Sequence, residues 1–188
     1  VGGQAANNLA SPLSDNGYPI LGTPTDMIDR AENRKEFSSL LGRLGVDQPA
    51  WDEVKSLAQA KNFAKKVGYP ILVRPSFVLS GAAMNVVHTE DELASYLSEA
   101  ALVSRGHPVV ISQFISNGKE LEIDGVAQDG NIVVHAITEH VENAGVHSGD
   151  ATVVIPPQRL YLETIRRAKQ ITRKIAQALN ITGPFNIQ

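Results

Sequence analysis

Three segments of the sequence place polar side chains beside glycines or other small residues at the ends of apolar runs, namely 74–84, 113–120 and 139–150. Backbone amides and side chains at such ends can converge on a phosphate group. Arg74 ends the apolar run 71–73, so its guanidinium must either pair internally or face a cleft. Its planar fork of five donors suits phosphate or carboxylate. Position alone leaves a buried structural ion pair and an anion-binding role equally open.

The other chemical signals are less specific. Ser80-Gly81-Ala82-Ala83 has no side chain large enough to block a ligand, so its amides could cover phosphates, although an ordinary turn is the alternative. The GxxxxGK[ST] and GxGxxG nucleotide motifs are absent. The segment 139–150 holds two histidines and three carboxylates, which is compatible with a surface loop and with a metal-nucleotide site.

The elements that must position these segments follow from apolar periodicity. Helical spacing predicts helices at residues 5–13, 25–44, 54–67 and 160–179, and another that begins near residue 89. β-rich runs predict strands at residues 71–74, 84–87, 108–114, 121–127, 132–137 and 183–188. Asp129-Gly130 should join two of the strands in an antiparallel hairpin. The expected fold class is therefore α+β, with each polar segment next to a strand.

Composition narrows the classes of function. The 188 residues carry a net charge of −3 with no long Lys or Arg run, which argues against nucleic acid and anionic membrane surfaces as partners. No apolar run approaches the ~20 residues that a membrane-spanning helix needs. The absence of cysteine excludes thiolate metal sites, and the histidines lack HExxH spacing. Any bound metal should therefore have oxygen ligands.

Several segments together resemble the large subunit of carbamoyl phosphate synthetase. The resemblance rests on residues 29–34, 48–49, 74–84, 139–150 and 183–188, and the run AGVHSGD at 144–150 is its most specific part. This family resembles a tandem of two ATP-grasp units, the first phosphorylating bicarbonate and the second phosphorylating carbamate. Segments 80–84 and 139–144 look like the second unit. The resemblance thus implies an ATP-dependent carbon-nitrogen ligase with an ATP-grasp fold.

The resemblance also implies site residues. Arg34 and Arg74 would bind phosphates, with Arg74 catalytic, and Ser80 and Gly81 would belong to the loop that covers them. The nucleotide pocket would be lined by Gln113, Ile115, Glu120, Gly145, Val146, His147, Ser148 and Gln188. Ile115 would bond adenine through its backbone, and Glu120 would hold the ribose and a potassium ion. Gln188 would bind Mg²⁺ or Mn²⁺. Gln113 stands where the family often has a basic residue.

Domain limits and partners follow from the same resemblance. Residues 1–24 should end a Rossmann-like pre-ATP-grasp domain, and 25–188 should form an incomplete ATP-grasp domain whose further metal ligands lie downstream. Residues 1–188 alone should then make no carbamoyl phosphate. Expected partners are ATP, carbamate, the rest of the large subunit and a glutaminase subunit or domain, in the cytoplasm or mitochondrial matrix. The alternatives are a non-catalytic nucleotide-binding module and another ATP-grasp ligase such as a biotin carboxylase.

Overall fold

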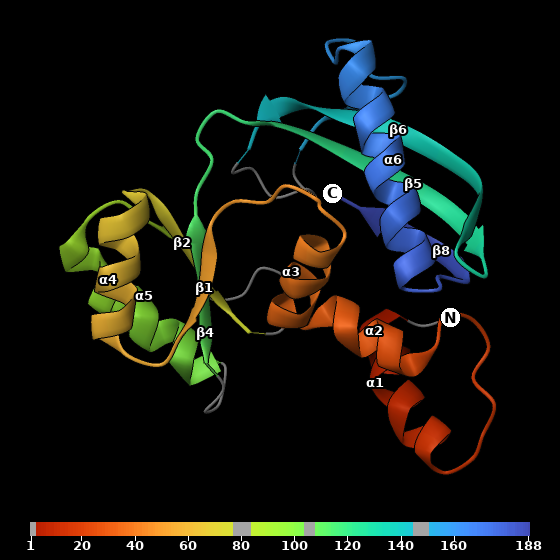
Figure 1. Ribbon diagram of the computed structural model, residues 1–188, viewed down its shortest axis with the longest axis horizontal. Helices are drawn as coiled ribbons and strands as arrows, with labels where there is room; N and C mark the ends of the chain where they lie inside the picture. Colours follow the sequence, from red (N-terminus) through yellow and green to blue (C-terminus); the bar gives the residue numbers. More distant parts are fainter. Residues whose placement is uncertain (1–2, 77–83, 104–107, 145–150) are drawn as a thin grey trace. The chain divides into compact units, whose positions relative to one another are not determined.

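The computed structural model describes residues 3–76, 84–103, 108–144 and 151–188, and it divides into two compact units. The central unit comprises Glu32–Lys119 and Asn143–Ala151, and the terminal unit comprises Val1–Ala31, Glu120–Glu142 and Thr152–Gln188. Each unit has its own four-stranded sheet (Figure 1). Each is described by itself below.

The sheet of the central unit has the strand order β1-β4-β2-β3, and every neighbouring pair in it is antiparallel. Its strands are β1 (Trp51–Val54), β2 (Ile71–Pro75), β3 (Asn85–Val87) and β4 (Val109–Gln113). The helices α4 (Leu57–Val67) and α5 (Glu90–Val103) lie together on one side of this sheet (Figure 1). The helix α3 (Arg34–Arg43) belongs to the same unit.

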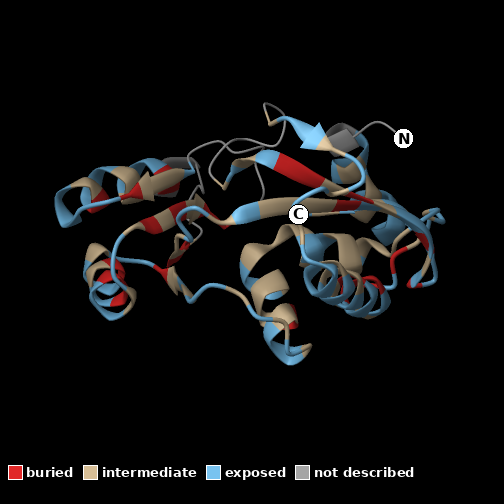
Figure 2. Cartoon of the chain, turned by 90° about the horizontal axis from the view of Figure 1, so that it is seen from above, coloured by how far each residue is buried: buried red, intermediate tan, exposed pale blue. Residues whose placement is uncertain are grey.

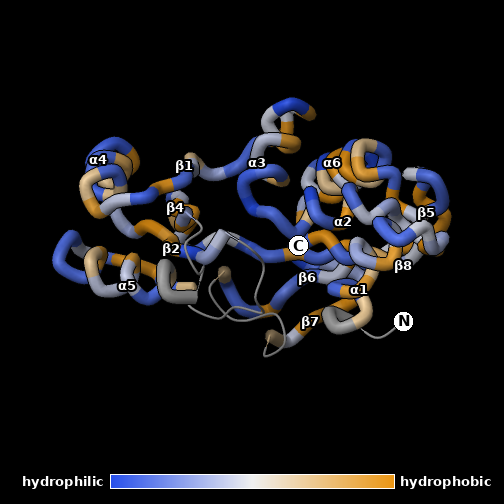
Figure 3. The backbone as a smooth tube through the Cα atoms, turned by 90° about the horizontal axis from the view of Figure 1, so that it is seen from below, coloured by the Kyte–Doolittle hydropathy of each residue, from blue (hydrophilic) through white to orange (hydrophobic). Residues whose placement is uncertain are grey.

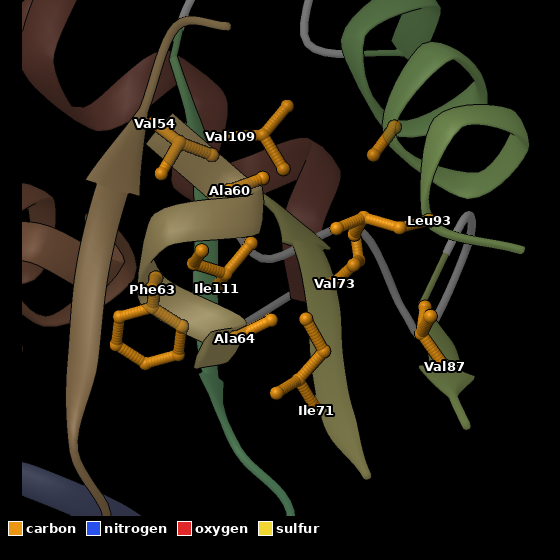
Figure 4. Close-up of a cluster of buried hydrophobic side chains, with 11 residues drawn as sticks. Val54, Ala60, Phe63, Ala64, Ile71, Val73, Val87, Leu93, Val109 and Ile111 are labelled. Carbon is orange, nitrogen blue, oxygen red and sulfur yellow. The ribbon is translucent and has the colours of Figure 1, made fainter. Parts of the chain in front are cut away.

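A single apolar cluster holds the central unit together. Side chains alternate along β2, so Ile71 and Val73 are fully buried while Arg74 is only half-buried. Ile71 and Val73 pack with Phe63 of α4 and Leu93 of α5 (Figure 4). Arg74 therefore lies on the face of the sheet opposite to α4 and α5, and this face carries polar groups.

Local capping explains where two of the helices begin. The side chain of Asn33 accepts a hydrogen bond from the Glu36 amide at 3.1 Å, so α3 starts at Arg34. Ser56 accepts one from the Gln59 amide at 3.3 Å and starts α4. Gly68, with φ 82°, ends α4 in a conformation that a glycine adopts without strain.

The sheet of the terminal unit has the order β7-β6-β5-β8. Its strands are β5 (Lys119–Gln128), β6 (Asn131–Asn143), β7 (Val153–Val154) and β8 (Gly183–Ile187). The amphipathic helix α6 (Leu162–Ala178) lies across this sheet (Figure 1), and its Thr172, Ile175 and Ala176 are buried. Two shorter helices, α1 (Gly3–Asp15) and α2 (Thr25–Glu32), precede the sheet in the chain.

Burial and hydropathy follow the same pattern in both units. Figure 2 shows helices that are buried along one side and exposed along the other. Hydrophobic and hydrophilic residues accordingly alternate along α4 and α6 (Figure 3). In the part of the chain that the structure describes, no helix is both long and apolar enough to cross a membrane.

The α+β prediction is confirmed, as are the hairpin at Asp129-Gly130 and the strand that begins at Gly183. Three local predictions are wrong. The expected helix at 25–44 is broken at Asn33 into α2 and α3, because Asn33 caps the second helix. The expected helix at 54–67 starts later, since residues 51–54 pair with β4 as strand β1.

The third wrong prediction concerns the polar loop expected from Glu139 onward, for which a surface position and a metal-nucleotide site were both left open. Residues 139–143 continue strand β6, and the side chains of Glu139 and His140 are buried, with exposed fractions of 2% and 1%. Polarity alone indicated a loop here, but these polar groups have buried hydrogen-bonding partners. Residues 145–150 lie outside the described part of the chain.

Candidate functional site

The start of α3 lies beside the end of strand β2 in the central unit. The Arg34 amide donates to the carbonyl of Ser76 at 3.1 Å, and Arg34 Nε donates to the carbonyl of Pro75 at 3.0 Å. These bonds hold Arg34 beside the end of β2, next to Arg74. Lys35, the next residue of the helix, forms an ion pair with Glu53 of β1 at 2.6 Å. Strand and helix thus bring Arg34 and Arg74, here called the arginine pair, to one place.

The arginine pair is short of counter-charge. Arg74 Nη2 donates to Ser112 Oγ at 3.4 Å, and its buried Nε has no hydrogen-bond partner. Among the described residues, no carboxylate forms an ion pair with Arg34 or Arg74. Burial, and to a smaller extent the charge of Arg34, lowers the pKa of the Arg74 guanidinium to about 10. Burial also lowers the pKa of Arg34.

This geometry favours anion binding over a structural ion pair. Two cations on one face, with an unused donor and lowered pKa values, are stabilised when an anion supplies the missing negative charge. Because guanidinium groups bind phosphate oxygens two at a time, a group with several such oxygens suits this place. The described residues thus fit the phosphates of a nucleotide.

Two other predicted site residues, Gln113 and Ile115, lie at the far end of the same sheet from Arg74. In the pairing of β2 with β4, Arg74 stands opposite Val110, whereas Gln113 stands opposite Ile71. Three residue steps separate these pairs, roughly 10 Å along the strands. Ile115 follows β4 and is 51% exposed. The structure therefore does not bring Gln113 or Ile115 into contact with the arginine pair.

In the terminal unit, Glu120 lies beside a buried histidine. His140 Nδ1 is 3.2 Å from Glu120 Oε2, and His140 Nε2 is 2.9 Å from Glu122 Oε1. The His140 side chain is 1% exposed, compared with 25% for Glu120 and 16% for Glu122. The geometry between Nδ1 and Oε2 falls outside that of a hydrogen bond, and neither atom has another partner. Glu120 therefore combines a buried oxygen with a partly exposed carboxylate.

Strand β8 adds side-chain amides to the face of β5 that carries Glu122 and Asp124. Asn186 Nδ2 donates to Glu122 Oε2 at 3.2 Å and to Asp124 Oδ1 at 2.9 Å. Alternation along the strand places Gln188 on the face that carries Asn186, one step beyond the last paired residue. An amide oxygen there could serve as one metal ligand. No group of three or more acidic, histidine or cysteine side chains in the described ranges is arranged to hold a metal ion.

Sequence reasoning did not predict the roles of three residues. It named neither Glu122 nor Asn186, although Glu120, Glu122 and Asp124 recur at every second residue, which puts them on one face of a strand. It counted Glu139 only as one carboxylate of the polar segment 139–150, and did not predict that its Oε2 accepts hydrogen bonds from the amides of residues 158 and 159 at 2.9 and 2.8 Å. Only the three-dimensional structure shows that the chain returns to this carboxylate.

The remaining predicted site residues cannot be placed. Ser80, Gly81, Gly145, Val146, His147 and Ser148 all lie outside the described residues. The segment 145–150 is bracketed by described groups, since the Ala144 amide donates to the Gly118 carbonyl at 2.8 Å. On its other side, the Thr152 amide donates to Glu142 at 2.8 Å. This bond and one to the Glu142 backbone lower the pKa of the Glu142 carboxyl.

Residues 33–188 match the family described as carbamoyl-phosphate synthase L chain, ATP binding domain. Over all 188 residues, the chain is 62% identical to the multifunctional protein pyrABCN of Emericella nidulans, of which it covers 8%. It is 57% identical to the carbamoyl phosphate synthase arginine-specific large chain of Cutaneotrichosporon cutaneum, covering 16%. The chain thus spans less than a fifth of the length of these curated relatives.

Solved structures share the fold at low identity. D-alanyl-alanine synthetase A from Vibrio cholerae superposes with a TM-score of 0.82 at 17% identity, over 97% of this chain and 58% of that one. The biotin carboxylase domain of the 2-oxoglutarate carboxylase from Hydrogenobacter thermophilus gives a TM-score of 0.79 at 19% identity, over 96% of this chain and 41% of that one. These neighbours confirm the predicted ATP-grasp fold, and at such identities they show the fold alone.

Proposed function

The chain belongs to the carbamoyl-phosphate synthase L chain ATP-binding domain family, and from this membership we propose that it supplies the ATP site that phosphorylates carbamate in a larger ligase. In this proposal it is part of the second of two ATP-grasp units. Relatives named as carbamoyl phosphate synthase large chains support the assignment. So does the lead-in to AGVHSGD, which resembles the second unit.

The observation that carries the proposal is the arginine pair. Arg34 and Arg74 lie together without a described carboxylate partner, and Arg74 keeps a buried Nε unsatisfied. Phosphoryl transfer depends on positioning phosphates and neutralising their charge more than on a protein nucleophile. In the proposed role, both guanidinium groups bind ATP phosphates, and Arg74 stabilises the charge that develops in the transition state.

The other assigned contacts are proposals from the family resemblance. The Ile115 backbone would bond adenine, and Gln113, Gly145, Val146, His147 and Ser148 would line the nucleotide pocket. Ser80 and Gly81 would cover the phosphates. Glu120 would accept from the ribose hydroxyls and help to hold potassium, and its unpartnered buried oxygen and partial exposure fit a ligand of that kind. Gln188 would be one of several oxygen ligands of Mg²⁺ or Mn²⁺, which balances phosphate charge when bound.

The reaction then follows from this arrangement. A carbamate oxygen attacks the γ-phosphorus of ATP, the bond to the β,γ-bridging oxygen breaks, and carbamoyl phosphate and ADP leave. The arginine pair holds the phosphates in line and neutralises charge on the transferred group. The loop that contains Ser80 and Gly81 would exclude water, which would otherwise compete with carbamate.

The proposed partners lie in the rest of the protein. Curated relatives extend far beyond the matched segment, so the remaining large chain and a glutaminase subunit or domain would supply carbamate. The names of the relatives include arginine-specific large chains, one of them mitochondrial. We propose that the parent protein serves arginine, urea or pyrimidine synthesis, in the cytoplasm or the mitochondrial matrix.

The two half-reactions of the full-length ligase test this proposal. Arg74→Ala should lower the rate of ATP synthesis from ADP and carbamoyl phosphate by on the order of a hundredfold, while ATP hydrolysis driven by bicarbonate continues at the wild-type rate. Glu53→Gln, which changes a surface ion pair of the same unit, is the control and should affect neither. If Arg74→Ala removed only the bicarbonate-driven reaction, the segment would belong to the first unit. If the wild-type protein bound nucleotide but catalysed neither reaction, this would instead support a non-catalytic module.

A further inference from the structure

Three strands of the terminal unit contribute to one continuous chain of polar side chains. Asn186 of β8 donates to Glu122 of β5 at 3.2 Å, Glu122 lies 2.9 Å from His140 Nε2 of β6, and His140 Nδ1 lies 3.2 Å from Glu120. These four residues are here called the histidine-carboxylate chain. We propose that Glu122 is a positioning residue that sets the orientation of Glu120 through the ring of His140. The inference rests on the proposed function, because that proposal assigns Glu120 to the nucleotide.

The first link is between Glu122 and the histidine ring. An ionised carboxylate can only accept, so Nε2 of His140 is the donor in the 2.9 Å contact with Glu122. The hydrogen bond at one ring nitrogen determines the role of the other and the plane of the ring. Because His140 is 1% exposed, water cannot readily replace Glu122 as the partner of Nε2. Glu122 thus fixes the ring from one side.

The second link runs from the ring to Glu120. Nδ1 of His140 and Oε2 of Glu120 are both buried, and neither has a hydrogen-bond partner elsewhere. At 3.2 Å each is the polar neighbour of the other. A rotation of the ring would therefore move the group that faces Oε2. Since no described group donates to Oε1, this second oxygen of Glu120 is the one open to a ligand. In the proposal, this 3.2 Å contact is the step through which a change in the ring reaches the Glu120 carboxylate.

Asp124, next to the Asn186 end of the histidine-carboxylate chain, offers a matched control. Asn186 Nδ2 donates to Asp124 as well as to Glu122, at 2.9 and 3.2 Å. Asp124 stands on the same strand and the same face as Glu122, two residues further along. It is exposed, and in the part of the chain that the structure describes its side chain makes no hydrogen bond or ion pair with His140. A change at Asp124 alters charge on this face without touching the ring.

The test uses the full-length ligase with Glu122→Gln and Asp124→Asn. His140 and Asn186 contact different oxygens of Glu122, and a glutamine amide has an acceptor oxygen at one of these two positions and an NH₂ group at the other, so it cannot keep both contacts as they stand. Glu122→Gln should raise the KM for ATP about tenfold, with kcat within about threefold of wild type. Asp124→Asn should leave the KM for ATP within about twofold, as ordinary surface changes do. An equal rise in KM in both variants would overturn the proposal, because loss of charge alone would explain it.

A double-mutant cycle identifies the route of the effect. If Glu122 acts through Glu120, the variant Glu120→Gln with Glu122→Gln should have the same KM for ATP as Glu120→Gln alone. If the increases in KM of the two single variants multiplied in the double variant, Glu122 would act independently of Glu120, and this would overturn the proposal. A lower melting temperature in Glu122→Gln with an unchanged KM would do the same, since Glu122 would then be structural only. Glu122→Asp, which restores the charge, should recover part of the affinity.

Displacement of a fluorescent ATP analogue separates this inference from the proposed function. The wild-type protein should bind the analogue, and Glu122→Gln should weaken its binding about tenfold, whether or not carbamate is phosphorylated. Binding with this dependence on Glu122 but no synthesis of ATP from carbamoyl phosphate would remove the proposed reaction and keep the positioning role. Synthesis with binding that is unaffected by Glu122→Gln would keep the reaction and remove the positioning role.

Discussion

In the central unit, Arg74 directs its guanidinium toward Ser112, with Arg34 as the nearby charge and its own Nε unpaired. In the terminal unit, His140 lies between the carboxylates of Glu120 and Glu122. The first group has like charges and open donors, whereas in the second Glu122 is hydrogen-bonded to both His140 and Asn186, with only Nδ1 of His140 and Oε2 of Glu120 left without a hydrogen bond. The contrast indicates that the arginine pair is completed by a ligand, while the histidine-carboxylate chain is organised before a ligand arrives.

The largest expected effect on the reaction rate concerns the arginine pair. In the full-length ligase, Arg74→Ala should lower the rate of carbamate phosphorylation by on the order of a hundredfold, equivalent to ~3 kcal/mol of transition-state stabilisation. Steady-state rates with saturating ATP measure this. Were Arg74 a structural residue, the variant would instead unfold more easily while its folded fraction retained its rate.

A smaller kinetic effect is expected from a change at Glu120 in the histidine-carboxylate chain. Glu120→Gln removes a charge and one of the two acceptor oxygens, so the KM for ATP should rise about thirtyfold, equivalent to about 2 kcal/mol. Activation by potassium should weaken in the same variant. Titrations of ATP and of potassium chloride check both expectations. If neither titration changes, Glu120 is a structural strand residue and the contrast between the two groups loses its functional meaning.

Stability should respond in opposite directions in the two groups. The pKa of Arg74 is lowered to about 10 in the folded protein, so the charged form is disfavoured there and folding is penalised at every pH below that value. Arg74→Met should therefore stabilise the central unit by about 1 kcal/mol at pH 7, while lowering the rate of carbamate phosphorylation as Arg74→Ala does. Slower amide hydrogen exchange in β2 and β4 would show it.

His140→Leu is the matched test of stability in the terminal unit. It leaves two carboxylates facing an apolar side chain, so it should destabilise β5 and β6 by about 2 kcal/mol. Faster amide exchange in those strands is the expected result. Destabilisation by Arg74→Met, or stabilisation by His140→Leu, would contradict the view that only the arginine pair lacks its counter-charge.

The smallest effect concerns a surface pair outside both groups. A hydrogen bond from Lys61, at 2.8 Å, and its charge lower the pKa of Glu90 below 4.5. The pair therefore adds stability above pH 4.5, and this contribution is lost as the pH falls through the lowered value. Glu90→Gln should cause a slight destabilisation at pH 7, measured by amide exchange in α4 and α5, that disappears in acid. An effect as large as that of His140→Leu would contradict the weak role of exposed pairs.

Much of the fold and part of the site could be predicted from the sequence. The helix α6 and the hairpin of β5 and β6 were predictable because periodicity and the Asp129-Gly130 turn agree over many residues. Strand β1 was missed, since four residues carry little periodicity and their pairing with β4 depends on residues more than fifty positions away. The break at Asn33 depends on a single capping side chain within an otherwise helical pattern.

For the site, Arg74 could be singled out from residue type and position and Glu120 from the family resemblance, but the surroundings of these two residues could not be predicted. Whether Arg74 had a carboxylate partner was left open by the sequence, and the described residues provide none. His140 was expected in a polar loop, either at the surface or in a metal-nucleotide site, because a polar run resembles a loop when its partners are unknown. Partners distant in sequence decide both cases, and no local pattern encodes them.

The bonds that Glu139 makes have a consequence for sequence variation. Glu139 accepts from the amides of residues 158 and 159, and neither bond involves the side chain of Gln158 or Arg159. Any residue except proline can supply an amide at these two positions, so their identities are free to drift among relatives. Glu139 has no such freedom, since its replacement would leave the amides of residues 158 and 159 without their acceptor. Substitutions should therefore be tolerated at residues 158 and 159 and selected against at Glu139.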